Sequence, residues 1–71
     1  MRMEHRVGQI WEDCDPRSPY RRQVVIEALE GACCLCRGLV TGRLTRINVG
    51  GLRHPIDSSA KSGYRLVKDV P

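Results

Sequence analysis

Residues 20–36 read YRRQVVIEALEGACCLC, and the conformation of this stretch decides the fold class. The run Val24-Val25-Ile26 is β-branched, and such side chains are stiff at χ1 and fit a strand better than a helix. Gly31 then acts as a hairpin turn into the next strand. The alternative is a helix with Ser18 as N-cap, Pro19 as its first residue and Gly31 just past its end. The β-branched run favours strand, turn and strand, and we adopt that interpretation.

Short strands are also predicted on both sides of this stretch. Apolar and polar residues alternate cleanly over residues 42–49, and strand-forming residues cluster near both ends of the chain. The predicted strands cover residues 7–11, 20–30, 32–36, 42–49 and 63–67. Five short strands at a spacing of roughly 8–12 residues predict an all-β fold, a small five-stranded antiparallel barrel or sandwich. The polar stretch 57–63 is interpreted as a loop or a short helical turn before the last strand.

The length of the chain limits what it can contain. Its 71 residues are enough for one small domain, and the core of such a domain is thin. Hydrophobic residues make up 41% of the chain and charged residues 28%, which is typical of a globular protein and excludes a disordered one. We expect a flexible N-terminus at 1–6, a single domain over 7–68 and a C-terminal tail at 69–71.

Four cysteines, Cys14, Cys33, Cys34 and Cys36, raise the question of metal binding. The polar N-terminus and the absence of an apolar run of about 18 residues predict a cytoplasmic protein without a membrane partner, so the cysteines are expected to be thiols. On a strand, Cys34 and Cys36 face one side and Cys33 the other, so the three cannot meet on one ion without a turn. We expect small buried hydrophobic side chains, no metal and no cofactor; the alternative is a zinc site completed by Cys14 and a histidine.

An acidic cluster follows the first strand at Glu12, Asp13 and Asp15. Paired carboxylates can perform acid–base catalysis, but only in a pocket that separates their pKa values, and a barrel of this size offers a shallow one. We expect instead a loop in which Asp13 or Asp15 caps backbone N–H groups and pairs with Arg17. No catalytic residue is assigned, and the chain is not expected to be an enzyme.

The charge distribution carries the functional signal. The net charge is +4, and residues 1–35 carry −1 whereas residues 36–71 carry +5. A basic half of this kind is typical of proteins that bind a partner with many negative charges, and Arg binds phosphates and carboxylates bidentately. The predicted nucleic-acid-binding residues are Arg37, Arg43, Arg46, Arg53, Arg65 and Trp11, with Tyr20 or Tyr64 as further stacking surfaces. The competing interpretation is that the arginines only keep the domain soluble and that Trp11 is the main aromatic residue of the core.

Four short motifs occur in a fixed order between residues 7 and 67. They are Gly8-x-Ile10-Trp11-x-Asp13-x-Asp15-Pro16-Arg17, Arg22-x-Val24-Val25-Ile26, Gly42-Arg43-x-Thr45-x-Ile47 and Gly63-Tyr64-Arg65-Leu66-Val67. In this order they resemble a family of small, uncharacterised proteins of bacteria and phages, and the resemblance implies an SH3-like barrel without implying an activity. The start of the chain is also similar to the SH3-like ribonuclease toxins. Those toxins are longer, and this chain ends before the helices that complete them, so the similarity does not lead us to expect catalysis.

These observations predict a small binding module rather than an enzyme. The favoured partner is nucleic acid, bound through phosphate contacts to the Arg-rich half of the chain. The alternative partner is an acidic protein surface, as for a phage-encoded inhibitor of a host nucleic-acid-binding machine. A toxin-like ribonuclease is the third and least favoured class.

Overall fold

The structure, a computed structural model, describes residues 4–17 and 22–71. Its strands form one six-stranded sheet in the order β4-β3-β2-β1-β6-β5. The elements are β1 (Ile10–Asp13), β2 (Gln23–Glu30), β3 (Cys33–Gly38), β4 (Leu44–Asn48), the 3-10 turn η1 (Val49–Gly51), β5 (Leu52–His54) and β6 (Tyr64–Lys68). The all-β prediction is therefore confirmed. No helix in the described part of the chain is long and apolar enough to cross a membrane.

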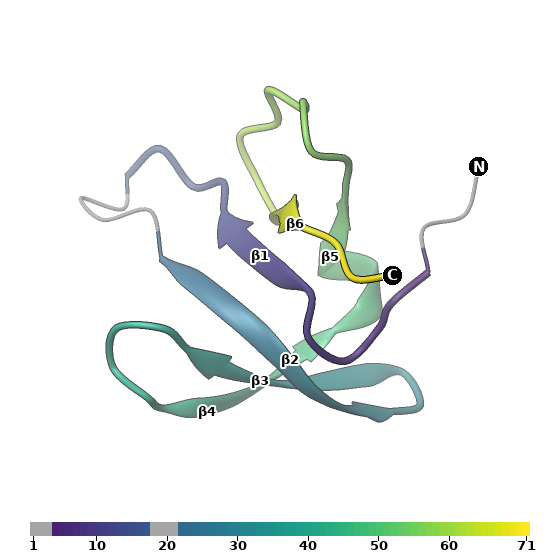
Figure 1. The fold of residues 1–71 in the computed structure, drawn as a ribbon. Coiled ribbons are helices and arrows are strands. Elements are labelled where there is room, and N and C mark those ends of the chain that lie inside the picture. Colours follow the sequence, from purple (N-terminus) through teal and green to yellow (C-terminus); the bar gives the residue numbers. More distant parts are fainter. Residues whose placement is uncertain (1–3, 18–21) are drawn as a thin grey trace.

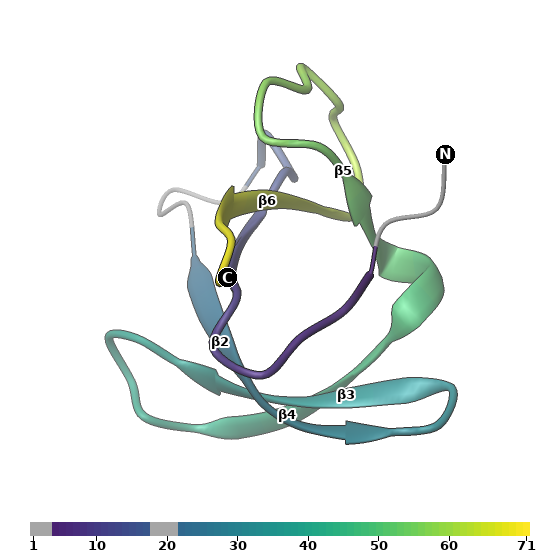
Figure 2. The ribbon, with the colours of Figure 1, turned by 45° about the vertical axis from the view of Figure 1, so that its right-hand side comes forward.

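The sheet curls into a half-barrel (Figures 1 and 2). The long strand β2 pairs with β3 on one side and with β1 on the other, so it connects the hairpin β3-β4 to the rest of the sheet. Four strand pairs are antiparallel, as predicted, but β5 pairs with β6 in parallel. The sixth strand and the mixed sheet differ from the five antiparallel strands that we expected. The reason lies at Gly50-Gly51, directly after the strand predicted over residues 42–49. There η1 turns the chain so that Leu52 comes to lie opposite Tyr64 on β6.

The segment that decided the fold class is a strand. β2 spans Gln23–Glu30, and Gly31 adopts φ 68° in the turn that leads into β3. Only glycine adopts this left-handed conformation freely. The strand interpretation of this stretch is therefore confirmed, although the proposed helix start at Ser18 and Pro19 lies outside the described residues. Between β5 and β6 the chain makes a turn at 56–57 and a bend at 61–63, and it does not form the helical turn considered there.

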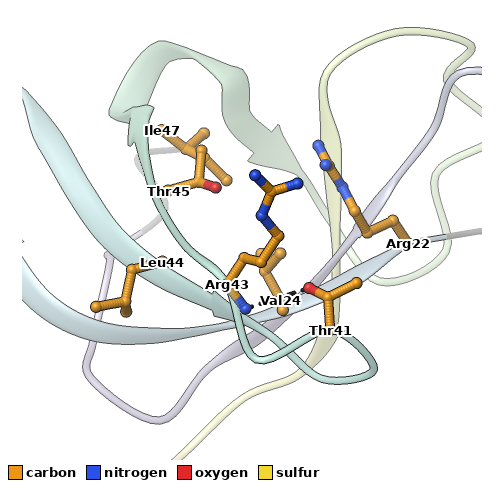
Figure 3. Close-up of a pocket in the computed structure, with 8 residues that line it drawn as sticks. Arg22, Val24, Thr41, Arg43, Leu44, Thr45 and Ile47 are labelled. Atoms are coloured by element: carbon orange, nitrogen blue, oxygen red, sulfur yellow. Dashed lines mark hydrogen bonds between the residues drawn. The ribbon is translucent and has the colours of Figure 1, made fainter.

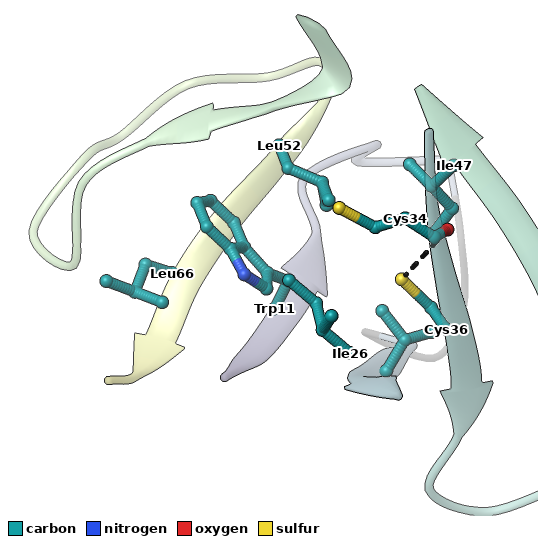
Figure 4. Packing of buried hydrophobic residues seen from close by; sticks show 8 residues of the cluster. Trp11, Ile26, Cys34, Cys36, Ile47, Leu52 and Leu66 are labelled. Carbon is teal, nitrogen blue, oxygen red and sulfur yellow. Dashed lines mark hydrogen bonds between the residues drawn. The ribbon is translucent and has the colours of Figure 1, made fainter. Parts of the chain in front are cut away.

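The core gathers around Trp11, whose side chain is 0% exposed at the centre of the curled sheet (Figure 4). Trp11 belongs to β1, which pairs with β2 on one side and with β6 on the other. Small and aliphatic side chains from the other strands complete this cluster: Val24, Ile26, Cys34, Cys36, Ile47, Leu52 and Leu66. The buried cluster therefore contains one aromatic ring among small and aliphatic side chains, and Val49 and Tyr64 pack against it partly buried.

A buried amide connects this core to both ends of the chain. Gln9 is 1% exposed, and its Oε1 accepts hydrogen bonds from Trp11 Nε1 and from the backbone N–H of Arg6, both at 3.1 Å. Its Nε2 donates to the carbonyl of Glu4 at 2.9 Å and to Oδ1 of Asp69 at 2.8 Å. Residues 4–6 and Asp69 are thus held against the domain, whereas residues 1–3 of the predicted flexible N-terminus lie outside the described residues.

The cysteines follow the predicted alternation along β3. Cys34 and Cys36 are 0% exposed on the inner face, Cys33 is half-buried on the other, and Cys14 is buried elsewhere. Burial raises the pKa of the Cys36 thiol to about 11. Among the residues that the structure describes, no group of three or more His, Cys, Asp or Glu side chains is placed to hold a metal ion.

This burial predicts unequal thiol reactivity. In the native protein at pH 8 we expect Cys33 to react with a thiol reagent such as DTNB in the first phase. Cys34 and Cys36 should react only after the sheet opens, because they are buried and the pKa of each thiol is raised. The variant Cys33→Ser should lose the first phase and keep the slow one. Rapid reaction of all four cysteines would contradict the packing of β3.

The buried amide predicts a large effect for a single polar substitution. Gln9→Ala leaves the indole N–H of Trp11 without its acceptor inside the core. An unsatisfied buried donor costs about 1–3 kcal/mol, so the free energy of unfolding measured by urea titration should fall by that amount. Gln23→Ala is the control, because among the described residues the amide of Gln23 makes a single long contact, of 3.4 Å to Glu12. Equal effects of the two substitutions would contradict the role given to Gln9.

Candidate anion-binding site

Three of the five arginines predicted to bind nucleic acid are engaged with carboxylates of β1 or β2. The Glu27 carboxylate is held by Arg37, which also keeps the pKa of that carboxyl below its usual range. In each pair the carboxylate comes from the acidic half of the sequence. The pairs are Arg37 with Glu27, Arg46 with Glu30 at 2.9 Å, and Arg65 with Glu12.

The strand register places two of these pairs on the outer face of the half-barrel. Arg37 lies opposite Leu44, and Arg46 lies opposite Leu35, whereas the buried Cys36 and Cys34 lie opposite Thr45 and Ile47 on the inner face. Side chains alternate between the faces of a strand. Arg43, two residues before Thr45, therefore lies on the inner side, opposite in direction to Arg46.

Arg43 and Arg22 line the same hollow in the inner face. The hollow has a volume of about 190 Å³, and the two guanidinium groups point into the same space (Figure 3). Val24 and Ile47 supply the apolar part of the lining, next to the core. The complete lining is Arg22, Val24, Gly38, Thr41, Arg43, Leu44, Thr45 and Ile47. No carboxylate is among them.

Within the described residues, neither guanidinium of this hollow forms an ion pair. Arg22 Nη2 donates instead to the hydroxyl of Tyr64 at 2.8 Å, which orients the side chain without neutralising it. That hydrogen bond, with a smaller contribution from Asp13, raises the pKa of Arg22. Neither arginine of the hollow therefore has an ion-pair partner among the described residues.

Backbone hydrogen bonds hold the two segments that carry Arg22 and Arg43. The carbonyl of Arg22 accepts from the N–H of Asp13 at 2.8 Å, and the carbonyl of Gln23 accepts from the N–H of Leu39 at 3.0 Å. The second contact ties the start of β2 to the loop that carries Arg43. The hollow is therefore built from two segments whose main chains are bonded to neighbouring strands.

A glycine is required where the loop leaves β3. A Cβ atom on Gly38 would stand 2.7 Å from Oγ1 of Thr41, closer than real Cβ contacts come. That Oγ1 also accepts from the N–H of Arg43 at 3.2 Å, as Figure 3 shows. Gly38 thus leaves room for the threonine that holds the backbone of Arg43.

The other predicted site residues lie outside the hollow. Trp11, expected to stack on bases, is completely buried, so neither face of its ring is open to a base; its position is that of the core aromatic in the competing interpretation. Arg53 on β5 is exposed and forms no ion pair with a described residue. Tyr64 orients Arg22, and Tyr20 lies outside the described residues.

Arg22 was not among the predicted site residues. It belongs to the half of the chain with a net negative charge, which directed attention away from it. The alternation of β2 contains the missing signal, because Arg22 stands two and four residues before the buried Val24 and Ile26. A residue in that position points to the same face at the end of the strand.

The acidic loop after β1 has the structural role that we predicted. Oδ1 of Asp13 accepts from the N–H of Asp15 at 3.0 Å, and the carboxylate of Asp15 pairs with Arg17 at 3.2 Å. The hydrogen bonds from Arg17 lower the pKa of Asp15. These carboxylates cap the loop.

Comparison of the chain with known protein families, with curated proteins and with solved structures gave no match. A guanidinium group has five N–H donors in a planar fork that matches the oxygens of phosphate or carboxylate. Two such groups beside the hydroxyls of Thr41 and Thr45 make the hollow suited to an oxyanion.

We expect inorganic phosphate to bind at this hollow. Titration of the labelled protein should shift the NMR signals of the Nε–H groups of Arg22 and Arg43, because their guanidinium groups have no carboxylate partner among the described residues. The signal of Arg46, which is paired with Glu30, serves as the internal control. Equal shifts of all arginine signals would contradict a localised site.

Proposed function

We propose that this protein is a small, non-enzymatic nucleic-acid-binding module that holds a backbone phosphate in the hollow between Arg22 and Arg43. One observation carries this proposal: two guanidinium groups without carboxylate partners among the described residues point into one hollow. Arginine forks bind phosphate oxygens bidentately and supply most of the affinity of sequence-independent binding.

The expected binding is electrostatic. The net charge of +4 attracts a polyanion over a distance, and the hollow of about 190 Å³ then receives one of its phosphates. Contacts to phosphates do not distinguish sequences. We therefore expect affinities in the range of non-specific binding, with Kd on the order of 10⁻⁴–10⁻⁶ M at physiological salt.

We further propose that the half-barrel is an SH3-like fold, as the motif order implies. The antiparallel run β4-β3-β2-β1-β6 and the single 3-10 turn after β4 support this assignment. Folds of this kind carry many unrelated functions. The functional proposal accordingly depends on the hollow and not on the fold.

Paired variants of β4 and the loop before it test the functional proposal. Arg43→Ala should weaken binding to nucleic acid about equally across sequences and lower the magnitude of the salt slope by about 1, since one phosphate contact is lost. Arg46→Ala is the matched control. It removes the same charge from the opposite face, where Glu30 already neutralises it, and should leave the affinity close to that of the wild type. Both are read by fluorescence anisotropy over a series of salt concentrations.

Two outcomes would overturn this proposal. Equal losses for the two variants would mean that net charge alone drives association. A wild-type protein that binds neither single strands nor duplexes at about 50 mM salt would exclude nucleic acid, since such salt favours electrostatic association. In that case an acidic protein surface is the partner to test next at the same hollow.

A further inference from the structure

The loop between β3 and β4 presents apolar side chains beside the hollow. Val40 is 96% exposed, and Leu39 and Leu44 on either side are 47% and 50% exposed. Single exposed apolar residues are ordinary on protein surfaces. Here three of them lie within six residues, and Leu44 itself contributes to the lining of the hollow. The exposed apolar side chains of the loop thus reach the rim of the hollow at Leu44.

Internal hydrogen bonds hold this loop in shape. The N–H of Gly42 donates to the carbonyl of Gly38 at 2.9 Å, and Nη1 of Arg37 donates to the carbonyl of Gly42 at 2.9 Å. The N–H of Leu39 is bonded to β2. Val40 is therefore held away from the core by a closed turn. Because the loop is already ordered, a partner that covers Val40 loses little free energy in ordering the loop.

We propose that the tip of this loop, Leu39-Val40, contacts an unpaired base of a single-stranded nucleic acid whose neighbouring phosphate lies in the hollow. This inference rests on the function proposed above and specifies its ligand. In a duplex the base faces are stacked inside two phosphate backbones. In a single strand they are free beside the phosphate of the same nucleotide. A cationic hollow next to an apolar tip is complementary to that alternation of phosphate and base.

The exposed apolar surface of the loop is too small to anchor the protein in a lipid bilayer. Val40 alone is almost completely exposed, and its neighbours are about half covered. Even a whole myristoyl chain gives only marginal membrane binding. The guanidinium groups of Arg22 and Arg43 also point into the hollow (Figure 3), which a flat bilayer surface does not enter. The geometry therefore favours a nucleotide over a membrane surface.

The test compares three probes of equal length: a single-stranded DNA oligonucleotide, its duplex, and an abasic strand that keeps the phosphates and lacks the bases. The wild type should bind the single strand more tightly than the other two. Val40→Thr keeps the shape of the side chain and replaces one methyl group by a hydroxyl. It should weaken binding to the single strand about fourfold, and leave the abasic strand unchanged. Ile56→Thr is the control, since Ile56 is 49% exposed in the loop between β5 and β6 and should affect no probe.

A gain-of-function variant completes the experiment. Val40→Trp should bind the single strand at least fivefold more tightly, because a base stacks on an indole ring, and bound DNA should quench the fluorescence of the exposed tryptophan. Val40 is almost completely exposed, so neither substitution at this position should change urea-induced unfolding.

The possible failures can be told apart. This inference would be overturned if the wild type bound all three probes equally and the Val40 variants bound like the wild type. If Arg43→Ala still weakened binding, the proposed function would stand. Absence of binding to every probe would overturn both. If Val40→Trp increased binding to vesicles of anionic phosphatidylserine and not to the single strand, the tip would be a membrane contact and the inference would be wrong.

Discussion

The burial of one indole ring is the constraint on which the rest of the structure depends. The chain contains no phenylalanine, and Trp11 is its only tryptophan. Its ring lies at the centre of the cluster that the curled sheet encloses, with side chains from β2, β3, β5 and β6 in the same cluster. Replacing such a ring by alanine typically costs about 3–5 kcal/mol, a large part of the stability of a small domain. A flat sheet would leave one side of the ring in water, so the curl and the burial of Trp11 require each other.

The charge pattern of the sequence is reorganised by strand pairing. The acidic half contains β1, β2 and the start of β3, and the basic half contains the rest of β3 together with β4, β5 and β6. In the sheet, β3 lies beside β2 and β6 lies beside β1. Pairing of β1 with β6 brings Glu12 to Arg65, and pairing of β2 with β3 brings Glu27 to Arg37. Glu30 on β2 reaches Arg46 on β4, on the far side of β3. A difference of charge along the chain thus becomes a set of ion pairs on the sheet. Arg22 and Arg43, which have no ion-pair partner among the described residues, come together at the hollow.

The sequence predicted well what depends on neighbouring residues. The β-branched run Val24-Val25-Ile26 predicted a strand, and the alternation over Cys33, Cys34 and Cys36 predicted which thiols are buried. β5 could not be predicted in this way, because a strand of three residues exists only through its pairing with β6. Of the two arginines of the candidate site, the sequence predicted Arg43 and not Arg22. Arg43 stands in a basic stretch of the sequence. The alternation of β2 indicates the face of Arg22, but only the fold shows that Arg22 and Arg43 line the same hollow.

The outer face and the hollow are connected through one side chain. Arg37 neutralises Glu27 on the outer face, and the same guanidinium donates to the carbonyl of Gly42, the residue before Arg43. Gly42 in turn closes the loop onto Gly38 in the left-handed conformation, with φ 71°. An arginine engaged in an ion pair outside therefore stabilises the turn that directs an unpaired arginine inside. The arginines thus differ in their physical role. Those paired with a carboxylate hold the sheet and its loop, whereas Arg22 and Arg43 direct guanidinium groups into the hollow at which we propose that a phosphate binds.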